Sequence, residues 1–464
     1  MSSPNPADIV AAPQVLKRSP PNGLSVLISG AGVGGLMTAL ECWRVGCDVR
    51  IFERSQGIVT TGDSFTIGAS AIDAFKNWPE LRHKNEAIAY HLMVSCCKHN
   101  GKQLMPPMEF SALTSDPANA PRIYRHSRPW FHAILHDQLG KVGLSVEYGM
   151  EAVDFFEDEQ AGCGGVVLQN GPRHEADLNL VAGMPVPAVS SGDAIFRTAY
   201  PVELALKDPV VADRFQLRGD GRSVVELWVG AFTLGYSAIR YPDVTQDTGT
   251  IEESWAHRVH PDEVLKFTST IPGWSDIGDR VIKTIPHDQL VDWKLMWRDP
   301  QPQWTSPAAR VVQLGDAAHT FLPSSGKGAT QAIEDAASLA ACILIAGDRQ
   351  SVPNATRVHN LLRFERVSCL QAFGVVNRSK ASTKAKDGED PKKKLVRVGK
   401  WMLEHDPERY AWENYHQALA HLEHGTPFQN TNTPKGLVYK PWTIEGLLEA
   451  QGRGEATILD GDWN

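Results

Sequence analysis

The chain has 464 residues, of which 42% are hydrophobic, with a formal net charge of −8 and a pI near 6.1. This length allows a large buried core and favours two or three domains. The acidic balance argues against nucleic acid or an anionic membrane surface as the main partner. The seven cysteines lack CxxC or metal-ligand spacing, which predicts reduced thiols, no metal site and a cytoplasmic protein.

The first 22 residues are rich in Pro, Ser and Asn, and we expect a flexible tail without a secretory signal. The longest apolar helix candidate, residues 336–346, is short, because about 20 residues are needed to cross a bilayer. We therefore expect a soluble monomer or homodimer without a membrane span, whose main ligand is a small molecule.

A glycine-rich turn follows the first predicted strand, residues 24–29. Its glycines, Gly30, Gly32 and Gly35, match the GxGxxG pattern at the start of a predicted helix, residues 36–44. In a βαβ unit the first glycine permits a tight turn, the second lets the backbone approach a pyrophosphate, and the third allows the helix to pack closely on the strand. The helix N-terminus adds unpaired N–H groups and the positive end of its dipole. We therefore predict that this turn binds a dinucleotide.

An acidic residue, Glu53, ends the second predicted strand, residues 49–52. It lies about 20 residues beyond the glycines, where a carboxylate accepts hydrogen bonds from an adenosine ribose. The alternative is a glycine-rich turn beside a surface glutamate. Because strand, helix, second strand and acid occur in the expected order, the sequence favours nucleotide binding.

A second motif follows a predicted buried strand, residues 310–314, that leads straight into a helix. The motif consists of Gly315-Asp316-Ala317-Ala318-His319, followed by Pro323, Gly326 and Gly328. The alternative is a strand-to-helix turn in which Asp316 caps the helix. A single histidine, His319, implies no metal site.

The remaining pattern predicts alternating strands and helices. Further predicted elements are a helix at 129–139, strands at 144–148 and 224–232, and a helix at 401–423. The domains we predict are a tail at 1–22, a discontinuous nucleotide-binding domain at 23–186 and 291–350, a sheet-bearing substrate domain at 187–290, and a C-terminal helical region with a tail at 351–464. In an acidic chain, the charged stretch 380–394 is interpreted as a solvated loop rather than a nucleic-acid patch.

These motifs resemble those of the group A FAD-dependent monooxygenases, especially the salicylate-hydroxylase-like branch of fungal secondary metabolism. The resemblance spans most of residues 24–350 and is most specific in the family's GDAAH-x3-P-x2-G-x-G signature. It implies an α/β fold with a Rossmann-like FAD-binding domain of the p-hydroxybenzoate hydroxylase/glutathione reductase type, an inserted sheet-bearing substrate domain and a C-terminal helical region. It also implies that the bound cofactor is FAD rather than NAD.

The resemblance gives roles to residues of the second motif. By position, Asp316 would bond the ribityl chain of FAD, and Pro323 would lie near the isoalloxazine ring. Gly326 belongs to the same signature, and the helix that starts at Gly328 would direct N–H groups toward the pyrimidine edge of the flavin. A helix N-terminus also stabilises the negative charge of reduced flavin.

Three further positions resemble functional residues of the family. Arg128 looks like an arginine that contacts FAD, although Arg125 fits that role too and a surface ion pair is the alternative. Arg197 resembles a substrate-domain arginine that faces flavin and substrate, where a guanidinium can hold an ionised phenol or position an indole. Asp63 resembles an acidic residue near the flavin, and an exposed loop aspartate is the alternative. The resemblance thus makes Arg197 and Asp63 the candidate catalytic residues.

The activity implied by the resemblance is hydroxylation by a single-component enzyme. Transient NADPH or NADH would reduce FAD, O2 would form a C4a-hydroperoxyflavin, and oxygen would pass to an electron-rich ring carbon. We expect a phenolic polyketide or an indole alkaloid as the substrate in secondary metabolite biosynthesis. Epoxidation and FAD-oxidase chemistry are the alternatives.

The chain departs from the family pattern at two places. After Gly183 the family's Asp-Gly turn, which helps bind FAD and NAD(P)H, is absent, and residues 184–187 stand in its place. Near residues 241–242 the family pattern predicts a longer hairpin. These departures leave a second function open, that of a catalytically impaired FAD-binding homologue.

Overall fold

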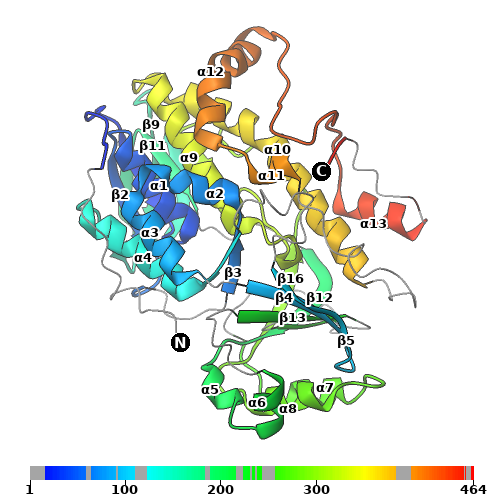
Figure 1. The fold of residues 1–464 in the computed structure, drawn as a ribbon. Coiled ribbons are helices and arrows are strands. Elements are labelled where there is room, and N and C mark those ends of the chain that lie inside the picture. Colours follow the sequence, from blue (N-terminus) through cyan, green and yellow to red (C-terminus); the bar gives the residue numbers. More distant parts are fainter. Residues whose placement is uncertain are drawn as a thin grey trace.

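The computed structural model describes residues 16–58, 64–89, 92–109, 123–182, 189–215, 223–229, 233–235, 238–242, 257–382, 399–453, 455 and 461–463. These residues form two main units, each built around its own sheet, with one unit above the other in Figure 1. Segments that are distant in the sequence contribute to both units.

A five-stranded parallel sheet is the centre of the first unit. Its strands, in spatial order, are β17 (Val311–Gln313), β11 (Leu178–Val181), β1 (Ser25–Ser29), β2 (Asp48–Glu53) and β7 (Val146–Tyr148). All neighbouring strands are parallel. Parallel strands of this kind are buried on both faces and are therefore apolar runs, as β11 illustrates with burial at every position. The sheet has the order that a Rossmann-like α/β unit requires.

Helices cover one face of this sheet and a small antiparallel sheet covers the other. Val26 and Ile28 of β1 contact the helical layer, whereas Leu27 contacts the small sheet, because side chains alternate along a strand. The main helices of the layer are α1 (Val33–Arg44), α4 (Arg128–Lys141), α9 (Gly328–Ala346), α10 (Val352–Ser382) and α12 (Pro407–His424). The small sheet consists of β10 (Arg173–Ala176), β9 (Cys163–Leu168) and β8 (Ala152–Asp158).

Helix α9 is the central helix of the layer and packs against α1, α10 and α12 (Figure 1). It begins at Gly328, as the second motif predicts, and it extends beyond the apolar run 336–346 because its first turns bury Gln331, Glu334 and Asp335, which are paired with other polar groups. Among the described residues, α9 alone is long and apolar enough to cross a bilayer. Since 78% of its most apolar window is buried inside the protein, α9 is a core helix.

A seven-stranded mixed sheet is the centre of the second unit. Its strands, in spatial order, are β16 (Val291–Trp297), β12 (Val189–Arg197), β15 (Ala238–Pro242), β14 (Thr233–Gly235), β13 (Ser223–Val229), β4 (Leu92–Lys98) and β5 (Gln103–Glu109). Only β13 and β4 pair in parallel; the other neighbours are antiparallel.

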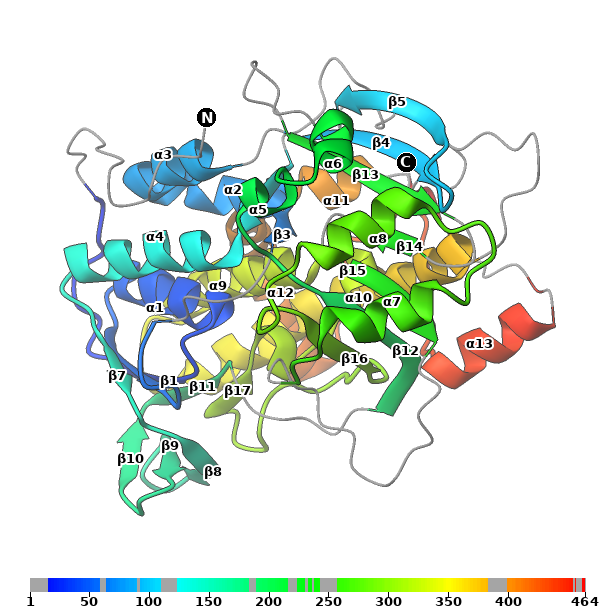
Figure 2. The same ribbon diagram turned by 90° about the horizontal axis from the view of Figure 1, so that it is seen from below.

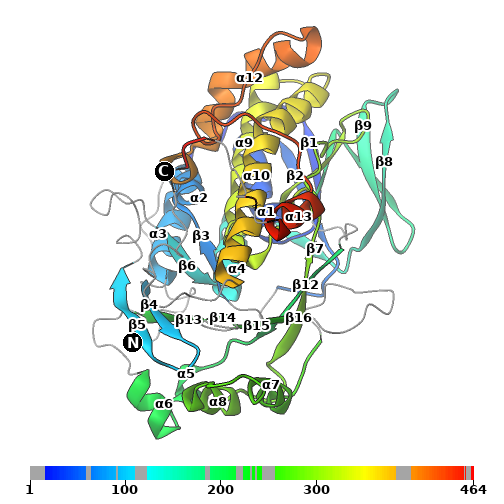
Figure 3. The same cartoon turned by 90° about the vertical axis from the view of Figure 1, so that its right-hand side faces the viewer.

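The two faces of this sheet have different partners. On the outer face, Ala194 and Phe196 of β12 pack with α7 (Pro261–Thr268) and α8 (Asp276–Lys283), which lie across the strands in Figure 2. On the inner face, Ile195 packs with residues of β16, α10 and the loop before α9. Helix α10 runs from the parallel unit down to this face in Figure 3. The inner face is therefore turned toward the second glycine motif.

The remaining named strands and α-helices of the described ranges lie around these units. They are β3 (Ser64–Ile67) and β6 (Tyr124–Ser127), which form a two-stranded sheet, and α2 (Ala69–Ala74), α3 (Pro79–Ile88), α5 (Val202–Ala205), α6 (Pro209–Arg214), α11 (Lys400–Leu403) and α13 (Ile444–Gly452).

The structure differs from the sequence predictions in three places. The predicted substrate-domain range of 187–290 leaves out β4, β5 and β16, which hydrogen bonding joins to the second sheet. The predicted helix 401–423 is interrupted, because Asp406 caps a new helix that begins at Pro407. Strand β17 leads into a short 3-10 turn before α9 rather than straight into a helix.

Several predictions concern residues outside the described ranges. These are Asp63, the segment that replaces the Asp-Gly turn after Gly183, the position of the expected hairpin beyond Pro242, and most of the charged stretch 380–394.

Candidate cofactor and substrate site

The first glycine turn is shaped for close approach of backbone atoms. Gly30 has a φ of +113°, in the region that favours glycine. A Cβ at Gly35 would lie 1.9 Å from the carbonyl oxygen of Gly30, so only glycine lets α1 pack against the turn. Gly32, which precedes α1, has open space where its Cβ would lie. The turn therefore leaves room beside the first N–H groups of α1, as a pyrophosphate requires.

Glu53 and His132 hold this turn from two sides. The carboxylate oxygens of Glu53 accept hydrogen bonds from the N–H groups of Ala31 and Ser55, both at 2.8 Å. His132 Nε2, on α4, lies 2.7 Å from the carbonyl oxygen of Ala31. A carboxylate has about four lone-pair positions, so Glu53 can hold the turn and still accept hydrogen bonds from ribose hydroxyls. The contact of His132 escaped prediction because the two residues are 101 positions apart.

Both glycine motifs lie at the same edge of the parallel sheet. The N–H of Ala182 donates to the carbonyl oxygen of Ser29, and the N–H of Leu314 donates to that of Val181, both at 2.9 Å. These bonds place the carboxyl ends of β1, β11 and β17 side by side, where open α/β sheets bind their ligands.

Asp316 lies on the short turn Gly315–Ala317 that follows β17. Its side chain is exposed to solvent, yet the protein around it is dense enough for desolvation to raise the pKa of its carboxyl group. Groups that oppose this shift through positive charge are His319, Arg128 and Arg298. The structure thus brings Arg128 within electrostatic reach of Asp316, whereas Arg125 Nε donates to Ser64 Oγ at 2.9 Å.

The rest of the signature forms the turn before α9. Pro323 opens a single 3-10 turn, and Gly326 follows it with a φ of +59°. Helix α9 begins at Gly328, and Asp316 Oδ1 lies 3.7 Å from the position of a Cβ at that residue. Asp316 therefore lies beside the N-terminus of α9.

A buried charge network on α9 and α10 holds the turn of the second motif. One carboxylate oxygen of Asp335 accepts hydrogen bonds from His319 Nε2 at 2.6 Å and from the N–H of Gly315 at 3.1 Å. The other oxygen accepts one from Arg363 Nε at 2.8 Å. Burial alone would raise the pKa of Asp335, but His319 and Arg363 hold this pKa well below its usual value. His319 is therefore committed to holding the turn.

Glu334 extends the network to α10. Its carboxylate accepts hydrogen bonds from Arg363 Nη1 at 2.6 Å, Arg366 Nε at 2.9 Å and Ser70 Oγ at 2.7 Å. Burial would raise the pKa of Glu334, but Arg366 and Arg363 hold it well below its usual value. These arginines were not predicted, because their partners lie on another helix. Their spacing of three residues, which places both on one helix face, was the available signal.

The candidate substrate-facing arginine lies on the inner face of the second sheet. Arg197, at the end of β12, has its Cζ atom 4.9 Å from the ring centre of Trp293 on β16, a cation–π contact. Its Nη2 donates to the carbonyl oxygen of Ser64 at 3.5 Å. Trp293 belongs to the same apolar cluster as Leu322, the residue before Pro323. The face that carries Arg197 thus packs toward the turn that leads into α9.

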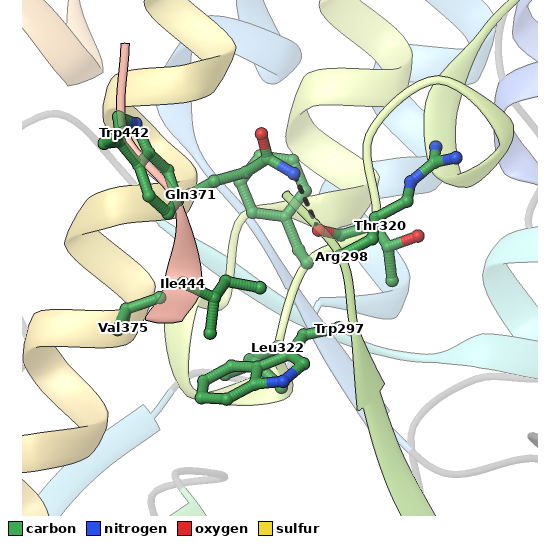
Figure 4. Close-up of a pocket in the computed structure, with 9 residues that line it drawn as sticks. Trp297, Arg298, Thr320, Leu322, Gln371, Val375, Trp442 and Ile444 are labelled. Carbon is green, nitrogen blue, oxygen red and sulfur yellow. Dashed lines mark hydrogen bonds between the residues drawn. The ribbon is translucent and has the colours of Figure 1, made fainter. Parts of the chain in front are cut away.

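A small pocket lies behind this turn. Figure 4 shows its lining residues, which come from β16, the loop after the second motif, α10 and the C-terminal region: Trp297, Arg298, Thr320, Phe321, Leu322, Gln371, Val375, Trp442 and Ile444. Gln371 Nε2 donates to the carbonyl oxygen of Thr320 at 2.9 Å. The cavity volume is about 10 Å³, which is enough for about one water molecule. The pocket is therefore too small for an aromatic substrate.

No family model matches the chain. Individual relatives do match over nearly its whole length. The chain is 40% identical to the FAD-dependent monooxygenase AacuC of Aspergillus aculeatus over 96% of this chain and 94% of the relative. It is also 40% identical to the FAD-dependent monooxygenase dmxR9 of a Cryptosporiopsis species over 97% of this chain and 91% of the relative.

Solved structures agree with these relatives. The crystal structure of FqzB matches with a TM-score of 0.78 and 25% identity, covering 90% of this chain and 100% of FqzB. A salicylate hydroxylase substrate complex shares the fold, with a TM-score of 0.64, 18% identity and coverage of 85% of this chain and 98% of the hydroxylase. The resemblance stated from the two motifs is thereby confirmed, and the chain belongs to the fungal FAD-dependent monooxygenases of secondary metabolism.

Proposed function

We propose that this FAD-dependent monooxygenase hydroxylates an electron-rich aromatic compound, either a phenolic polyketide or an indole alkaloid. The observation that carries the proposal is the contact between Arg197 and Trp293 on the inner face of the second sheet. It offers a fixed cation and an aromatic surface beside the turn that leads into α9. An electron-rich ring with an ionisable oxygen or a ring N–H suits such a site.

The residues of the first motif fit the adenosine half of FAD. The turn at Gly32 and the N-terminus of α1 would hold the pyrophosphate, and Glu53 would accept hydrogen bonds from the ribose.

The residues of the second motif fit the flavin half. The exposed carboxylate of Asp316 would accept hydrogen bonds from the ribityl chain, and the start of α9 at Gly328 would face the pyrimidine edge. Arg128 would add positive charge beside Asp316. Bound FAD, reduced by NADPH or NADH, supplies the activation of O2 for transfer of one oxygen atom.

The chain's own contribution is to orient the substrate and exclude water. Arg197 would hold a phenolate oxygen through its planar N–H edge while the Trp293 ring fixes the plane of the guanidinium. The apolar side chains around Trp293 would keep water from the reacting ring. Asp63, which precedes Ser64 in the chain, would act as the acidic partner at this site.

A second candidate function is FAD binding without turnover. The alignment with AacuC extends over 496 positions, more than the 464 residues of this chain. The relative therefore contains segments that this chain lacks, and we propose that the Asp-Gly turn is one of them. If that turn is required for reduction of FAD by NAD(P)H, this protein would bind FAD, and the bound FAD would remain oxidised.

The test is NADPH and NADH oxidation by FAD-loaded protein with panels of phenols and indoles, in the wild type and in Arg197→Gln. We expect substrate-stimulated oxidation, and we expect Arg197→Gln to lower kcat/KM at least tenfold, the effect of about 1.4 kcal/mol of lost transition-state binding. The matched control is Arg173→Gln, which removes another cation–π pair, at 3.9 Å from the Phe156 ring on the small sheet. Equal activity in both variants would refute the role of Arg197.

A further inference from the structure

Arg298 is a buried arginine that joins the two units of the protein. It directly follows β16 of the second sheet and is 6% exposed. Its Nη2 donates to the carbonyl oxygens of Ala317 at 2.5 Å and of Asp316 at 3.3 Å. The end of a substrate-sheet strand is thus tied to the backbone of the turn that carries Asp316.

The hydrogen bonding of Arg298 is incomplete. Its Nε and Nη1 are buried and have no hydrogen-bond partner within the described part of the chain. Burial lowers the pKa of Arg298, and the charge of Asp316 opposes that shift. A buried guanidinium that bonds only backbone carbonyls is costly. Its two hydrogen bonds place this costly group at the turn that carries Asp316.

Asp316 has the complementary arrangement. The residue is exposed, and the charged groups that act on its carboxylate are His319 on its own loop, Arg128 on α4 and Arg298 after β16. His319 is already paired with Asp335 at 2.6 Å. Arg298, which is buried, therefore adds its positive charge to that of Arg128 near the carboxylate.

We propose that Arg298 is a positioning residue for FAD, which holds the Asp316 turn through two backbone carbonyls and keeps the Asp316 carboxylate ionised for hydrogen bonding to the cofactor. An ionised carboxylate accepts stronger hydrogen bonds than a neutral acid. Removal of the positive charge would favour the protonated form of Asp316. Since protonation is then possible at higher pH, FAD would be released at a higher pH than in the wild type.

The test measures FAD affinity of the full chain by flavin fluorescence from about pH 5 to about pH 9, a range that brackets neutral pH. The variants are Arg298→Gln, which removes the charge, and Arg298→Lys, which keeps it. Asp316→Asn is tested alone and combined with Arg298→Gln. The matched control is Arg310→Gln, because Arg310 is 7% exposed and donates to the carbonyl oxygen of Asp177 at 3.0 Å, at the other end of β17.

We expect Arg298→Gln to weaken FAD binding about tenfold near neutral pH, as loss of a charge-dependent hydrogen bond predicts, and to move the pH of FAD release upward. Arg298→Lys is expected to keep the wild-type pH of release. The upward shift should vanish when Asp316→Asn is also present. Arg310→Gln is expected to leave FAD affinity unchanged.

A uniform loss of FAD affinity at every pH in Arg298→Gln would overturn the proposal, because Arg298 would then only hold the turn in place. An upward shift that persists in the Asp316→Asn background would overturn it as well. If Arg298→Gln does not fold, Arg298→Lys decides alone, because the proposal requires its pH of release to match the wild type. These readouts concern FAD affinity and are independent of whether NAD(P)H is oxidised.

Discussion

Two glycines of the first turn, Gly35 and Gly32, should respond differently to the same added methyl group. In Gly35→Ala the new Cβ would lie 1.9 Å from the carbonyl oxygen of Gly30. That neighbour is a backbone atom, so the turn or α1 must move. Overpacking of a rigid site costs about 3 kcal/mol of folding free energy. We expect Gly35→Ala to destabilise the apoprotein by about that amount and to abolish FAD binding.

Gly32→Ala is the matched change. No atom lies within 4 Å of its added Cβ, and its φ of −70° suits any residue. We expect the stability of the apoprotein to change by less than about 0.5 kcal/mol. FAD affinity should nevertheless fall at least about tenfold, because the methyl group occupies the space predicted for the pyrophosphate.

The assays are thermal or urea unfolding of the apoprotein and FAD titration by fluorescence. Wild-type FAD affinity in Gly32→Ala would refute the assignment of this turn to the cofactor. Unchanged stability in Gly35→Ala would refute the packing argument, since the turn would then be more adaptable than its geometry indicates.

Two further predictions concern buried charge. Arg363→Met should lower the free energy of unfolding, measured in urea, by about 3–5 kcal/mol, because buried carboxylates lose their counter-charge. The control Arg409→Met, at an exposed ion pair, should have little effect. Similar losses in both variants would contradict a stabilising role of the buried charge network. Burial lowers the pKa of His126 to about 3, whereas an unfolded histidine titrates near about 6.5. Between these values the unfolded state binds a proton that the folded state does not, so stability falls with decreasing pH by about 1.4 kcal/mol per pH unit. The ring of His126 lies 5.2 Å from that of Phe131, and His126→Phe keeps an aromatic ring at this position. It should reduce the pH dependence when urea unfolding is measured at several pH values; an unaltered slope would show that His126 is not the titrating group.

The parts of the fold that local sequence determines were predictable. The strand, the glycine turn and the acid at Glu53 follow one another within a short segment, and so do the residues from Gly315 to Gly328. Each glycine is required by a local constraint, such as the positive φ of Gly30 and Gly326. The family resemblance then identified the cofactor as FAD, because these local constraints alone do not distinguish FAD from NAD.

Long-range partnerships could not be predicted in the same way. Strands β4 and β5 join the second sheet through pairing with β13, more than 100 residues later in the chain. Arg298 acts on Asp316 through backbone carbonyls, which carry no sequence signal. Arg363 of α10 neutralises the buried carboxylates in the first turns of α9, and the sequence of α9 alone does not indicate this partner.

We infer that the chain remains a working monooxygenase without the family's Asp-Gly turn. The most direct measurement is product analysis after reaction of FAD-loaded protein with NADPH or NADH, isotopically labelled O2 and a panel of phenols and indoles. We expect nicotinamide oxidation stimulated by substrate and one labelled oxygen atom in the product. Bound FAD that neither nicotinamide reduces, with no label in any product, would contradict it and establish an FAD-binding protein without turnover.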